Sequence, residues 1–454
     1  MKIFNYQFCN FQSIFKKSIK QLRHSMKIEN CDLKILLQSR SGQSLAEVMI
    51  GLAIGAILIG AASFAITTML KTNLTAQRSQ FAANLAQETI ERVRSYASAD
   101  WQNVYGLSKG SSTPYYFVAS GTQFLVVQGS EGIIENDIRS GLVGHWGFDE
   151  ATGTIAYDGT GDKKHGVLTN NPIRATSTCR VSSCLQFDGL TNYVSIPAPA
   201  ITTAFTFSSW VYYVASEGGY AGLINSITGI NGQRNRILLN NSNQMYYQSL
   251  VGGVTTDFYF TIPSTYKNSW HHYVLIYNGS NLTAFYDGLQ TDVPKSLVGT
   301  LDGGTTNATL GWGSQTIYHL NGYMDDVRIY NRALSANEVK QLYNSSIYSR
   351  SFYVEDACRT NDASSTYSGV SPCGFGSVDD PSSQKITAQV DWGTGLGVGQ
   401  IVLSDMLTRW KNAIFQQSDW SGGTSGDVLI NSGTTFASST NVDFTDGSLR
   451  VNGL

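Results

Sequence analysis

Two pairs of cysteines lie close enough in the chain to react with one another. Cys179 and Cys184 form the first pair, and Cys358 and Cys373 form the second. An even number of cysteines at short spacing is typical of disulfides in exported proteins. Metal ligation is the alternative, but neither pair has a second thiol pair or a histidine at the spacing of a zinc site. The sequence therefore predicts two local disulfides and an exported body.

Two acidic doublets, Asp149-Glu150 and Asp325-Asp326, raise the question of glycoside hydrolysis, because glycosidases use a pair of carboxyl groups. Neighbouring residues of a β-strand point to opposite faces, so neither doublet can supply both groups to one site. We therefore expect no enzyme activity. A membrane-anchored enzyme acting on glycans is the alternative, and it would need an acid pair from separate segments.

A third chemical feature lies near the N-terminus. Gln43 follows Gly42, and Glu47 is the fifth residue after Gly42. An uncharged apolar run extends from residue 48 to residue 70 and is long enough to span a bilayer as a helix. A carboxylate in lipid costs free energy unless it has a partner. The position of Glu47 therefore favours a role beyond simple anchoring.

The surroundings of this run distinguish it from a secretory signal peptide. Residues 1–42 hold eight Lys and Arg against two acids, which predicts a segment retained in the cytoplasm. A signal peptide would have a shorter apolar region and a small-residue cleavage site. Here a helical pattern continues to residue 96, with Phe81, Leu85 and Ile90 among its apolar positions. We expect one helix of about 50 residues, apolar first and amphipathic afterwards.

The residues around Gly42 resemble the signature of type IV prepilins, in which a glycine precedes an apolar run and a glutamate stands five positions later. The resemblance implies that a prepilin peptidase cleaves after Gly42 and methylates the new N-terminus at Gln43. It also implies that Glu47 pairs with the N-terminal amine of a neighbouring subunit during assembly. Gln43 departs from the aromatic residue usual at that position, and Met26 is an alternative start that would shorten the leader.

The amino-acid composition indicates the class of protein to which the chain belongs. Of its 454 residues only 14% are charged, against roughly 25% in an average soluble domain, and 45 are glycines. A polar but uncharged chain with many turns is typical of extracellular all-β proteins. The net charge is −2 and no basic stripe lies outside the leader, so we expect no nucleic-acid partner.

Residues 141–343 consist of short alternating runs, such as residues 270–277, separated by Asp-Gly and Asn-Gly turns. Many short strands punctuated in this way predict an antiparallel sandwich or barrel. Ser335 and Glu338 have the spacing of a capping box, which predicts one short helix over residues 335–343.

The same stretch resembles the LamG-like jelly rolls of the concanavalin type. The resemblance begins at residues 141–150, GLVGHWGFDE, and closes at residues 320–338, LNGYMDDVRIYNRALSANE. It implies two curved antiparallel sheets packed face to face. It also implies binding of a glycan or protein ligand rather than catalysis.

The resemblance makes a structural calcium ion a further expectation, because oxygen-rich loops suit this hard cation. Asp158, in the loop of residues 157–162, and Asp325 are its candidate ligands. No other cofactor is expected.

Two tyrosine doublets, Tyr212-Tyr213 and Tyr246-Tyr247, could stack on sugars. Side chains alternate between the two faces of a strand, so we expect half of each doublet to lie in the core.

The segments before and after the jelly roll are expected to form one domain together. Residues 97–138 hold two strand patterns without a hydrophobic finish, and Ile347 starts in mid-strand without a linker. Residues 348–410 resemble minor pilins of the PilV-like kind. We therefore expect the jelly roll to be inserted in a pilin loop, which is feasible because domain termini often lie close together. Three domains in series are the alternative.

The predicted fold class is α+β: a long N-terminal pilin helix, transmembrane and then amphipathic, and a small antiparallel sheet, interrupted by an all-β LamG-like jelly-roll sandwich. The predicted boundaries are 1–42 for the prepilin leader, 43–138 for the helix and first part of the pilin domain, 139–345 for the sandwich, 346–415 for the second part of the pilin domain, and 416–454 for a C-terminal extension.

These features together predict a minor type IV pilin-like subunit that displays a lectin-like domain for adhesion or for binding a glycan or protein ligand. A pseudopilin of a type II secretion or DNA-uptake machine is the alternative, since it also needs Gly42 and Glu47. The expected partners are the prepilin peptidase, other pilin subunits, the membrane during biogenesis, and the ligand of the sandwich. We expect a single-pass precursor in the inner (cytoplasmic) membrane and a mature subunit in an extracellular filament or at the cell surface.

Overall fold

The computed structural model describes residues 45–135, 137–199, 201–214, 218–226, 235–303, 307–313, 318–345, 347–360, 367–370, 373–374, 377–393, 398–409, 442–443 and 450–451. The predicted leader lies outside these residues. Of the predicted C-terminal extension, only the short paired strands β25 (Val442–Asp443) and β26 (Arg450–Val451) are described. The chain divides into two units, residues 1–71 and residues 72–454.

Helix α2 (Leu45–Ala99) contains both the apolar run and the amphipathic pattern, so the predicted continuous helix is confirmed. It is the one helix in the described residues that is long and apolar enough to cross a membrane. In its apolar part Thr67 donates its hydroxyl to the carbonyl of Ser63 at 2.6 Å, and Thr68 donates to the carbonyl of Phe64 at 2.8 Å. These bonds satisfy the hydroxyls within the helix and make them compatible with an apolar environment.

The second part of α2 buries one side and exposes the other. Ala82, Ala86, Ile90 and Val93 are buried and recur at helical spacing, so they form one stripe. On the solvent side, ion pairs one turn apart, such as Arg94 with Glu91 at 2.7 Å, support the helix. The buried stripe requires a partner surface, and a sheet provides it.

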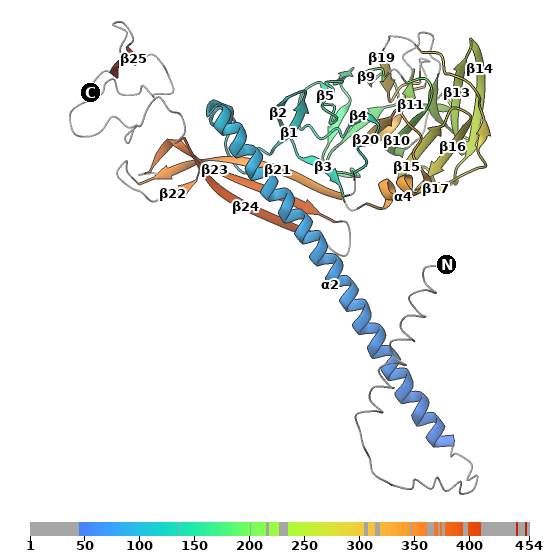
Figure 1. Ribbon diagram of the computed structural model, residues 1–454, viewed down its shortest axis with the longest axis horizontal. Helices are drawn as coiled ribbons and strands as arrows, with labels where there is room; N and C mark the ends of the chain where they lie inside the picture. Colours follow the sequence, from blue (N-terminus) through green and yellow to red (C-terminus); the bar gives the residue numbers. More distant parts are fainter. Residues whose placement is uncertain are drawn as a thin grey trace, which may run out of the picture. The chain divides into compact units, whose positions relative to one another are not determined.

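That partner is the first sheet, with the strand order β2-β1-β21-β23-β24 and with β3 and β22 also paired to β21. The buried stripe of α2 packs on residues of this sheet such as Tyr348, Phe352 and Ile386. Figure 1 shows β21, β23 and β24 lying side by side. The elements of this part are α3 (Gln102–Tyr105), β1 (Tyr115–Ser120), β2 (Gln123–Gln128), β3 (Glu131–Ile134), β21 (Ile347–Arg359), β22 (Tyr367–Val370), β23 (Val378–Trp392) and β24 (Gly399–Thr408).

The strands of this sheet come from two separate segments of the chain. β1 to β3 precede the sandwich in the sequence, and β21 to β24 follow it. β3 pairs with β21 so that Ile134 is the partner of Ile347. The sandwich is therefore inserted in the first domain, although the exact residue boundaries given above stay a prediction.

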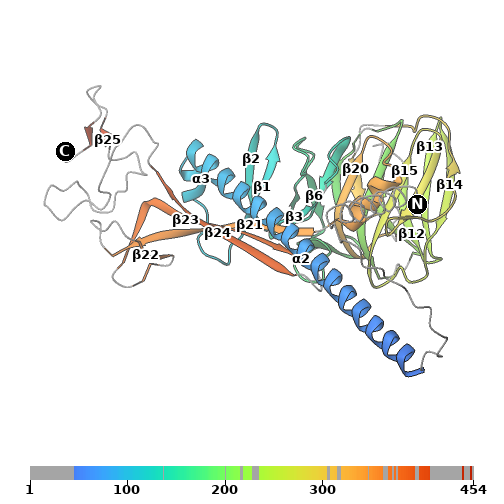
Figure 2. The ribbon, with the colours of Figure 1, turned by 60° about the horizontal axis from the view of Figure 1, so that its bottom comes forward.

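The inserted sandwich consists of two antiparallel sheets (Figure 2). The nine-stranded sheet has the order β17-β16-β15-β10-β20-β8-β7, with β18 paired to β16 and β4 paired to β20, and the eight-stranded sheet has the order β14-β13-β12-β11-β19-β9-β6-β5. The strands are β4 (Leu142–Trp146), β5 (Ile155–Ala156), β6 (Gly166–Thr169), β7 (Ile173–Ala175), β8 (Cys184–Asp188), β9 (Tyr193–Pro197), β10 (Phe205–Tyr213), β11 (Tyr220–Asn225), β12 (Arg236–Asn240), β13 (Gln244–Val251), β14 (Val254–Thr261), β15 (Trp270–Tyr277), β16 (Asn281–Tyr286), β17 (Leu289–Gln290), β18 (Lys295–Ser296), β19 (Asn307–Leu310) and β20 (Asn321–Tyr330).

Alternation along the strands builds one apolar core between the two sheets. Phe207, Leu275 and Ile329 of the nine-stranded sheet share this core with Leu239 and Tyr247 of the eight-stranded sheet. Burial of such side chains is the main stabilising contribution in a domain of this kind. The fold is therefore α+β as predicted, with a concanavalin-type sandwich as its larger β part.

Helix α4 (Ala336–Asn344) covers part of the outer side of the nine-stranded sheet through Val339 and Leu342. Its predicted capping box is confirmed, because the Ser335 hydroxyl accepts from the Glu338 N–H and the Glu338 carboxylate accepts from the Ser335 N–H. These bonds satisfy N–H groups that the first helical turn leaves unpaired.

The two ends of the sandwich meet, as expected for an insertion. β4 is its first strand and β20 its last, and the two pair so that Trp146 is the partner of Val327. The chain thus enters and leaves the sandwich on neighbouring strands, and it leaves and re-enters the first sheet on neighbouring strands as well.

Candidate functional site

Of the residues predicted to act in processing and assembly, Glu47 lies at the start of the described chain. Gly42 and Gln43 are outside the described residues, so their predicted roles stay untested. Glu47 lies in the first turn of α2, where the helix dipole favours a carboxylate, and it is exposed. The large apolar side chains that follow, such as Leu52 and Ile57, are each 70% exposed. A surface of this kind requires lipid or other helices around it.

Both predicted disulfides are present. Cys179 bonds to Cys184 with Cα atoms 5.5 Å apart, and Cys358 bonds to Cys373 with Cα atoms 5.4 Å apart. The first closes a short loop before β8 in the sandwich. The second ties β21 of the first sheet to the segment that precedes β23.

Two buried carboxylates hold the loop that the first disulfide closes. Asp325 accepts hydrogen bonds from the backbone N–H groups of Arg180 at 3.1 Å and Val181 at 2.8 Å. Asp149 accepts from the N–H of Ser183 at 3.4 Å, and its other oxygen accepts from the N–H of Gly132. Burial raises the pKa of both carboxyl groups well above the usual value. These two acids are therefore anchors for the loop.

Asp158 has a similar structural role in a different loop. It is fully buried and accepts hydrogen bonds from the N–H groups of His145, Thr160 and Lys164 at 3.1 to 3.2 Å. Its second oxygen also accepts from the Thr160 hydroxyl at 2.6 Å. The carboxylate therefore fastens the loop of residues 157–162 to β4.

These contacts do not fit a calcium site made of Asp158 and Asp325. The carboxylate of each accepts hydrogen bonds from N–H groups, and within the described residues the two acids share no hydrogen-bond partner. Across the described part of the chain, no group of three or more His, Cys, Asp or Glu side chains could hold a metal ion. Calcium binding stays an untested prediction.

The members of each acidic doublet have different surroundings. Asp326 is bound by Arg328, whereas Asp325 holds the disulfide loop. Although burial alone would raise it, the charge of Arg328 holds the pKa of Asp326 below its usual range. Glu150 forms an ion pair with Arg174 at 2.7 Å. Each carboxylate thus has a structural partner, and the predicted lack of enzyme activity stays a prediction.

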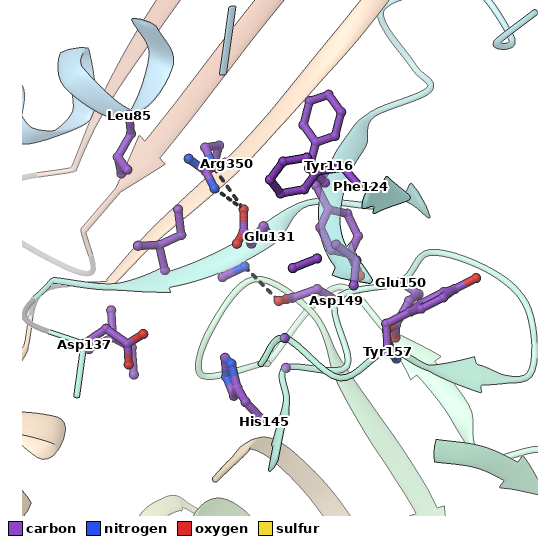
Figure 3. Close-up of a pocket in the computed structure, with 18 of the residues that line it drawn as sticks. Leu85, Tyr116, Phe124, Glu131, Asp137, His145, Asp149, Glu150, Tyr157 and Arg350 are labelled. Atoms are coloured by element: carbon purple, nitrogen blue, oxygen red, sulfur yellow. Dashed lines mark hydrogen bonds and ion pairs between the residues drawn. The ribbon is translucent and has the colours of Figure 1, made fainter. Parts of the chain in front are cut away.

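A cavity of about 300 Å³ lies between the sandwich and the first domain (Figure 3). Leu85 of α2, Tyr116 of β1 and Glu131 of β3 line it from the first domain, and His145 and Asp149 line it from the sandwich. Figure 3 shows Arg350 directed toward Glu131, with Asp149 on the other side of β3. The cavity walls are charged, and their charges are largely paired with one another.

Arg350 is the centre of that pairing. It lies on β21, is 6% exposed, and binds Glu131 of β3 at 3.0 Å and Glu88 of α2 at 3.1 Å. Although burial alone would lower it, the charges of Glu131 and Glu88 raise the pKa of Arg350. Arg350, Glu131 and Glu88 were not among the residues predicted from the sequence to form a site. A signal that could have pointed to them is the charged Arg350 within the strand pattern of residues 347–354.

The tyrosines of each doublet point to opposite faces of their sheet, as alternation predicts. Tyr213 and Tyr247 belong to the core between the sheets. Tyr212 and Tyr246 therefore point to the outer sides of the nine-stranded and eight-stranded sheets respectively. Tyr246 lies there beside Tyr220 and Tyr259, with ring centroids 5.5 Å and 5.0 Å away.

Two protein families match parts of the chain. The prokaryotic N-terminal methylation motif matches residues 37–63, and the concanavalin A-like lectin/glucanases superfamily matches residues 188–340. The chain is thus prepilin-like at its N-terminus and carries an inserted LamG-like domain. The motif implies processing by a peptidase and assembly with other pilins, and together with α2 it fits a membrane-anchored precursor. No curated protein matches the sequence.

Solved structures with some similarity include sugar-related and toxin domains. Domain 4 of an extracellular arabinanase from Geobacillus stearothermophilus is 16% identical, with a TM-score of 0.35, over 45% of this chain and 98% of that one. The binding domain of Paraclostridial Mosquitocidal Protein 1 is 14% identical, with a TM-score of 0.38, over 56% and 76%. A Trypanosoma rangeli sialidase is 17% identical, with a TM-score of 0.35, over 45% and 32%. Similarities this low say nothing about ligand or activity.

Proposed function

We propose that this protein is a minor subunit of a type IV pilus-like filament and that it displays its sandwich to bind a glycan or protein ligand. The observation that carries the proposal is the division of helix α2. Its first part is apolar and exposed, and its second part is buried against the first sheet by Ala82, Ala86, Ile90 and Val93. One helix therefore serves both as a membrane or filament segment and as the core of a folded domain.

Assembly follows from the chemistry of the N-terminal residues. Cleavage after Gly42 would free an amine at Gln43, and this amine would carry a positive charge at neutral pH. In a filament core of low polarity, the amine and the Glu47 carboxylate of a neighbouring subunit would satisfy each other. The exposed apolar part of α2 would then exchange acyl chains for the helices of other subunits.

The size of the insert supports a minor subunit. The sandwich contains two sheets of nine and eight strands and exceeds the first domain, which has one seven-stranded sheet. Such a bulk at every position would crowd a helical lattice. Rare positions or the filament tip accommodate it, and they would hold the sandwich where an external ligand can reach it.

The test is the N-terminal mass and sequence of the protein recovered from sheared surface filaments. A chain that begins at Gln43, methylated or not, supports the proposal. Protein with an intact N-terminus that is found only in membranes contradicts it and leaves an anchored binding module. Recovery from a secretion or DNA-uptake apparatus, with no surface filament, would instead identify the pseudopilin alternative.

A matched pair of variants separates assembly from folding. Glu47→Gln removes the carboxylate that the assembly step needs, so we expect processed protein that stays in the membrane. Glu91→Gln changes an exposed acid of the same helix that pairs with Arg94. We expect this control to enter filaments normally, because exposed pairs of this kind contribute little.

A further inference from the structure

Four tyrosines form a continuous cluster on the outer side of the eight-stranded sheet. They are Tyr220, Tyr246, Tyr259 and Tyr318, and we call this cluster the tyrosine face. The ring centroid of Tyr246 lies 5.0 Å from that of Tyr259 and 5.5 Å from that of Tyr220, and Tyr220 lies 5.1 Å from Tyr318. Their neighbours in sequence, Ala221, Met245, Tyr247 and Phe260, all belong to the core between the sheets. The tyrosines therefore point away from that core.

A row of polar side chains runs beside the tyrosines. The register pairs Arg236 of β12 with Gln248 of β13, and Gln248 with Asp257 of β14. Two residues from this pair on each strand, the same register pairs Tyr246 of β13 with Tyr259 of β14. Residues two apart on a strand share a face, so an aromatic row and a polar row lie next to each other across neighbouring strands.

Hydrogen bonds connect the two rows. The Tyr246 hydroxyl donates to Asp257 at 2.9 Å, and the Gln248 amide donates to both the Tyr246 hydroxyl at 2.9 Å and Asp257 at 3.0 Å. The guanidinium carbon of Arg236 lies 5.9 Å from the ring centroid of Tyr318. The polar groups are thus held in place before any ligand arrives, which lowers the entropic cost of binding.

The tyrosine face is accessible at its edge. β14 ends the order of its sheet, and on it Tyr259 is 39% exposed and Asp257 is exposed. Tyr220, Arg236 and Tyr318 are half-buried, whereas Tyr246 and Gln248 are buried, at 6% and 8% exposed. The side-chain amide oxygen of Gln248 has no hydrogen-bond partner within the described residues.

The chemistry of these groups selects the class of ligand. Aromatic rings offer flat apolar surfaces, and sugar rings present flat patches of C–H groups to stack on them. Carboxylate, amide and guanidinium groups together can accept from and donate to sugar hydroxyls. Arg236 and Asp257 balance each other in charge, which suits a neutral chain. A single arginine beside a carboxylate is a poor site for phosphates.

We propose that the tyrosine face binds a neutral glycan chain. Tyr259 would stack on a sugar ring with Tyr220 nearby, and Asp257 and Arg236 would bind sugar hydroxyls. Tyr246 and Gln248 are buried, and their hydrogen bonds would hold Asp257 in position. The inference rests on the proposed role of the sandwich as a binding module, and it names the ligand class and the site for that role.

The test uses the full-length protein in detergent and a panel of neutral hexasaccharides, namely cellohexaose, xylohexaose and mannohexaose, with oligogalacturonate as the acidic counterpart. Calorimetry measures the affinity for each. We expect at least one neutral hexasaccharide to bind and the acidic one to bind more weakly. Failure of every neutral probe to bind, or a preference for the acidic one, overturns the inference.

Substitutions locate the site. Tyr259→Ala should weaken binding at least tenfold, whereas Tyr259→Phe, which keeps the ring, should change it less than threefold. Tyr212→Ala alters the outer side of the other sheet and should leave the affinity unchanged. Melting temperatures equal to that of the unmodified protein show that the variants fold. Unchanged binding by Tyr259→Ala, or loss of binding by Tyr212→Ala, overturns the assignment.

The outcome is independent of the filament experiment. Protein that forms filaments with Gln43 at its terminus but binds no neutral glycan overturns the inference alone. Protein that binds the glycan through Tyr259 but stays unprocessed in the membrane supports the inference and overturns only the proposal that it is a filament subunit.

Discussion

Ile134 and Ile347 are paired neighbours on strands β3 and β21, although the whole sandwich lies between them in the sequence. This pair closes the first domain. Within the sandwich, its first and last strands, β4 and β20, are also paired, with Trp146 opposite Val327. Because both pairs are antiparallel, the sandwich is attached by two adjacent strands and leaves the register of the first sheet undisturbed.

The first prediction concerns removal of the sandwich. Replacing residues 135–346 by an Asn-Gly turn would convert β3 and β21 into a hairpin, since a two-residue turn joins directly paired residues. We expect the shortened protein to unfold cooperatively on heating and to retain the Cys358–Cys373 bond. Circular dichroism and mass spectrometry measure these properties. A matched deletion of residues 131–350 also removes the β3–β21 pairing and should be clearly less stable. An unfolded product from the first deletion would show that the first domain needs its insert.

The second prediction concerns Arg350. Arg350 is buried, and its removal leaves Glu131 and Glu88, which are 24% and 46% exposed, without this cation. Arg350→Met should therefore lower the free energy of unfolding by about 2 kcal/mol. Chemical denaturation measures the loss. Arg94→Met is the control, because Arg94 pairs with Glu91 and Asp405 at the surface and should contribute less than about 1 kcal/mol. Equal losses in the two variants would contradict a central role for Arg350.

The third prediction compares the two disulfides. Their cysteines are separated by 5 and 15 residues, and a disulfide that closes a longer loop restricts the unfolded chain more. Replacing Cys358 and Cys373 by serine should cost about 3 kcal/mol, and replacing Cys179 and Cys184 about 2 kcal/mol. Thermal unfolding with and without reductant provides the measurement. The opposite order would mean that the short loop, held by Asp149 and Asp325, depends on its disulfide more than chain entropy explains.

The fourth prediction concerns pH. Burial lowers the pKa of His272 to about 4, below its ordinary value of 6.5. Asp326 and Asp287 act to raise this pKa, and Arg328 and Arg180 act to lower it further. Between pH 6.5 and 4 the unfolded state binds a proton that the folded state does not, so stability is full above that window and falls as the pH falls. Titration of His272 changes the free energy of unfolding by at most about 1.4 kcal/mol per pH unit.

His272→Gln should remove this dependence, because glutamine does not titrate. Melting temperatures between pH 4 and pH 7 measure the slope. The same substitution at the partly exposed His271 is the control and should retain the slope of the unmodified protein. If the slope survives in His272→Gln, other groups are responsible for the loss of stability in acid.

Much of the architecture is local in origin, and the sequence alone determined it. The apolar run and the helical period predict α2, and the Ser335–Glu338 spacing predicts the start of α4. Strand alternation separates Tyr246 from Tyr247. Each of these features depends on residues that are neighbours in the chain, where geometry and solvation act directly. Short cysteine spacing predicts the two disulfides for the same reason.

The tertiary structure alone decided what the polar residues do. The sequence alone could not show that the fold places Asp325 under the N–H groups of Arg180 and Val181. Arg350 meets Glu131 and Glu88 because three distant segments pack together, and the tyrosine face draws on several strands. A side chain binds whatever the fold brings within hydrogen-bond distance, and distances between remote segments are set by packing of the core, which no local pattern encodes.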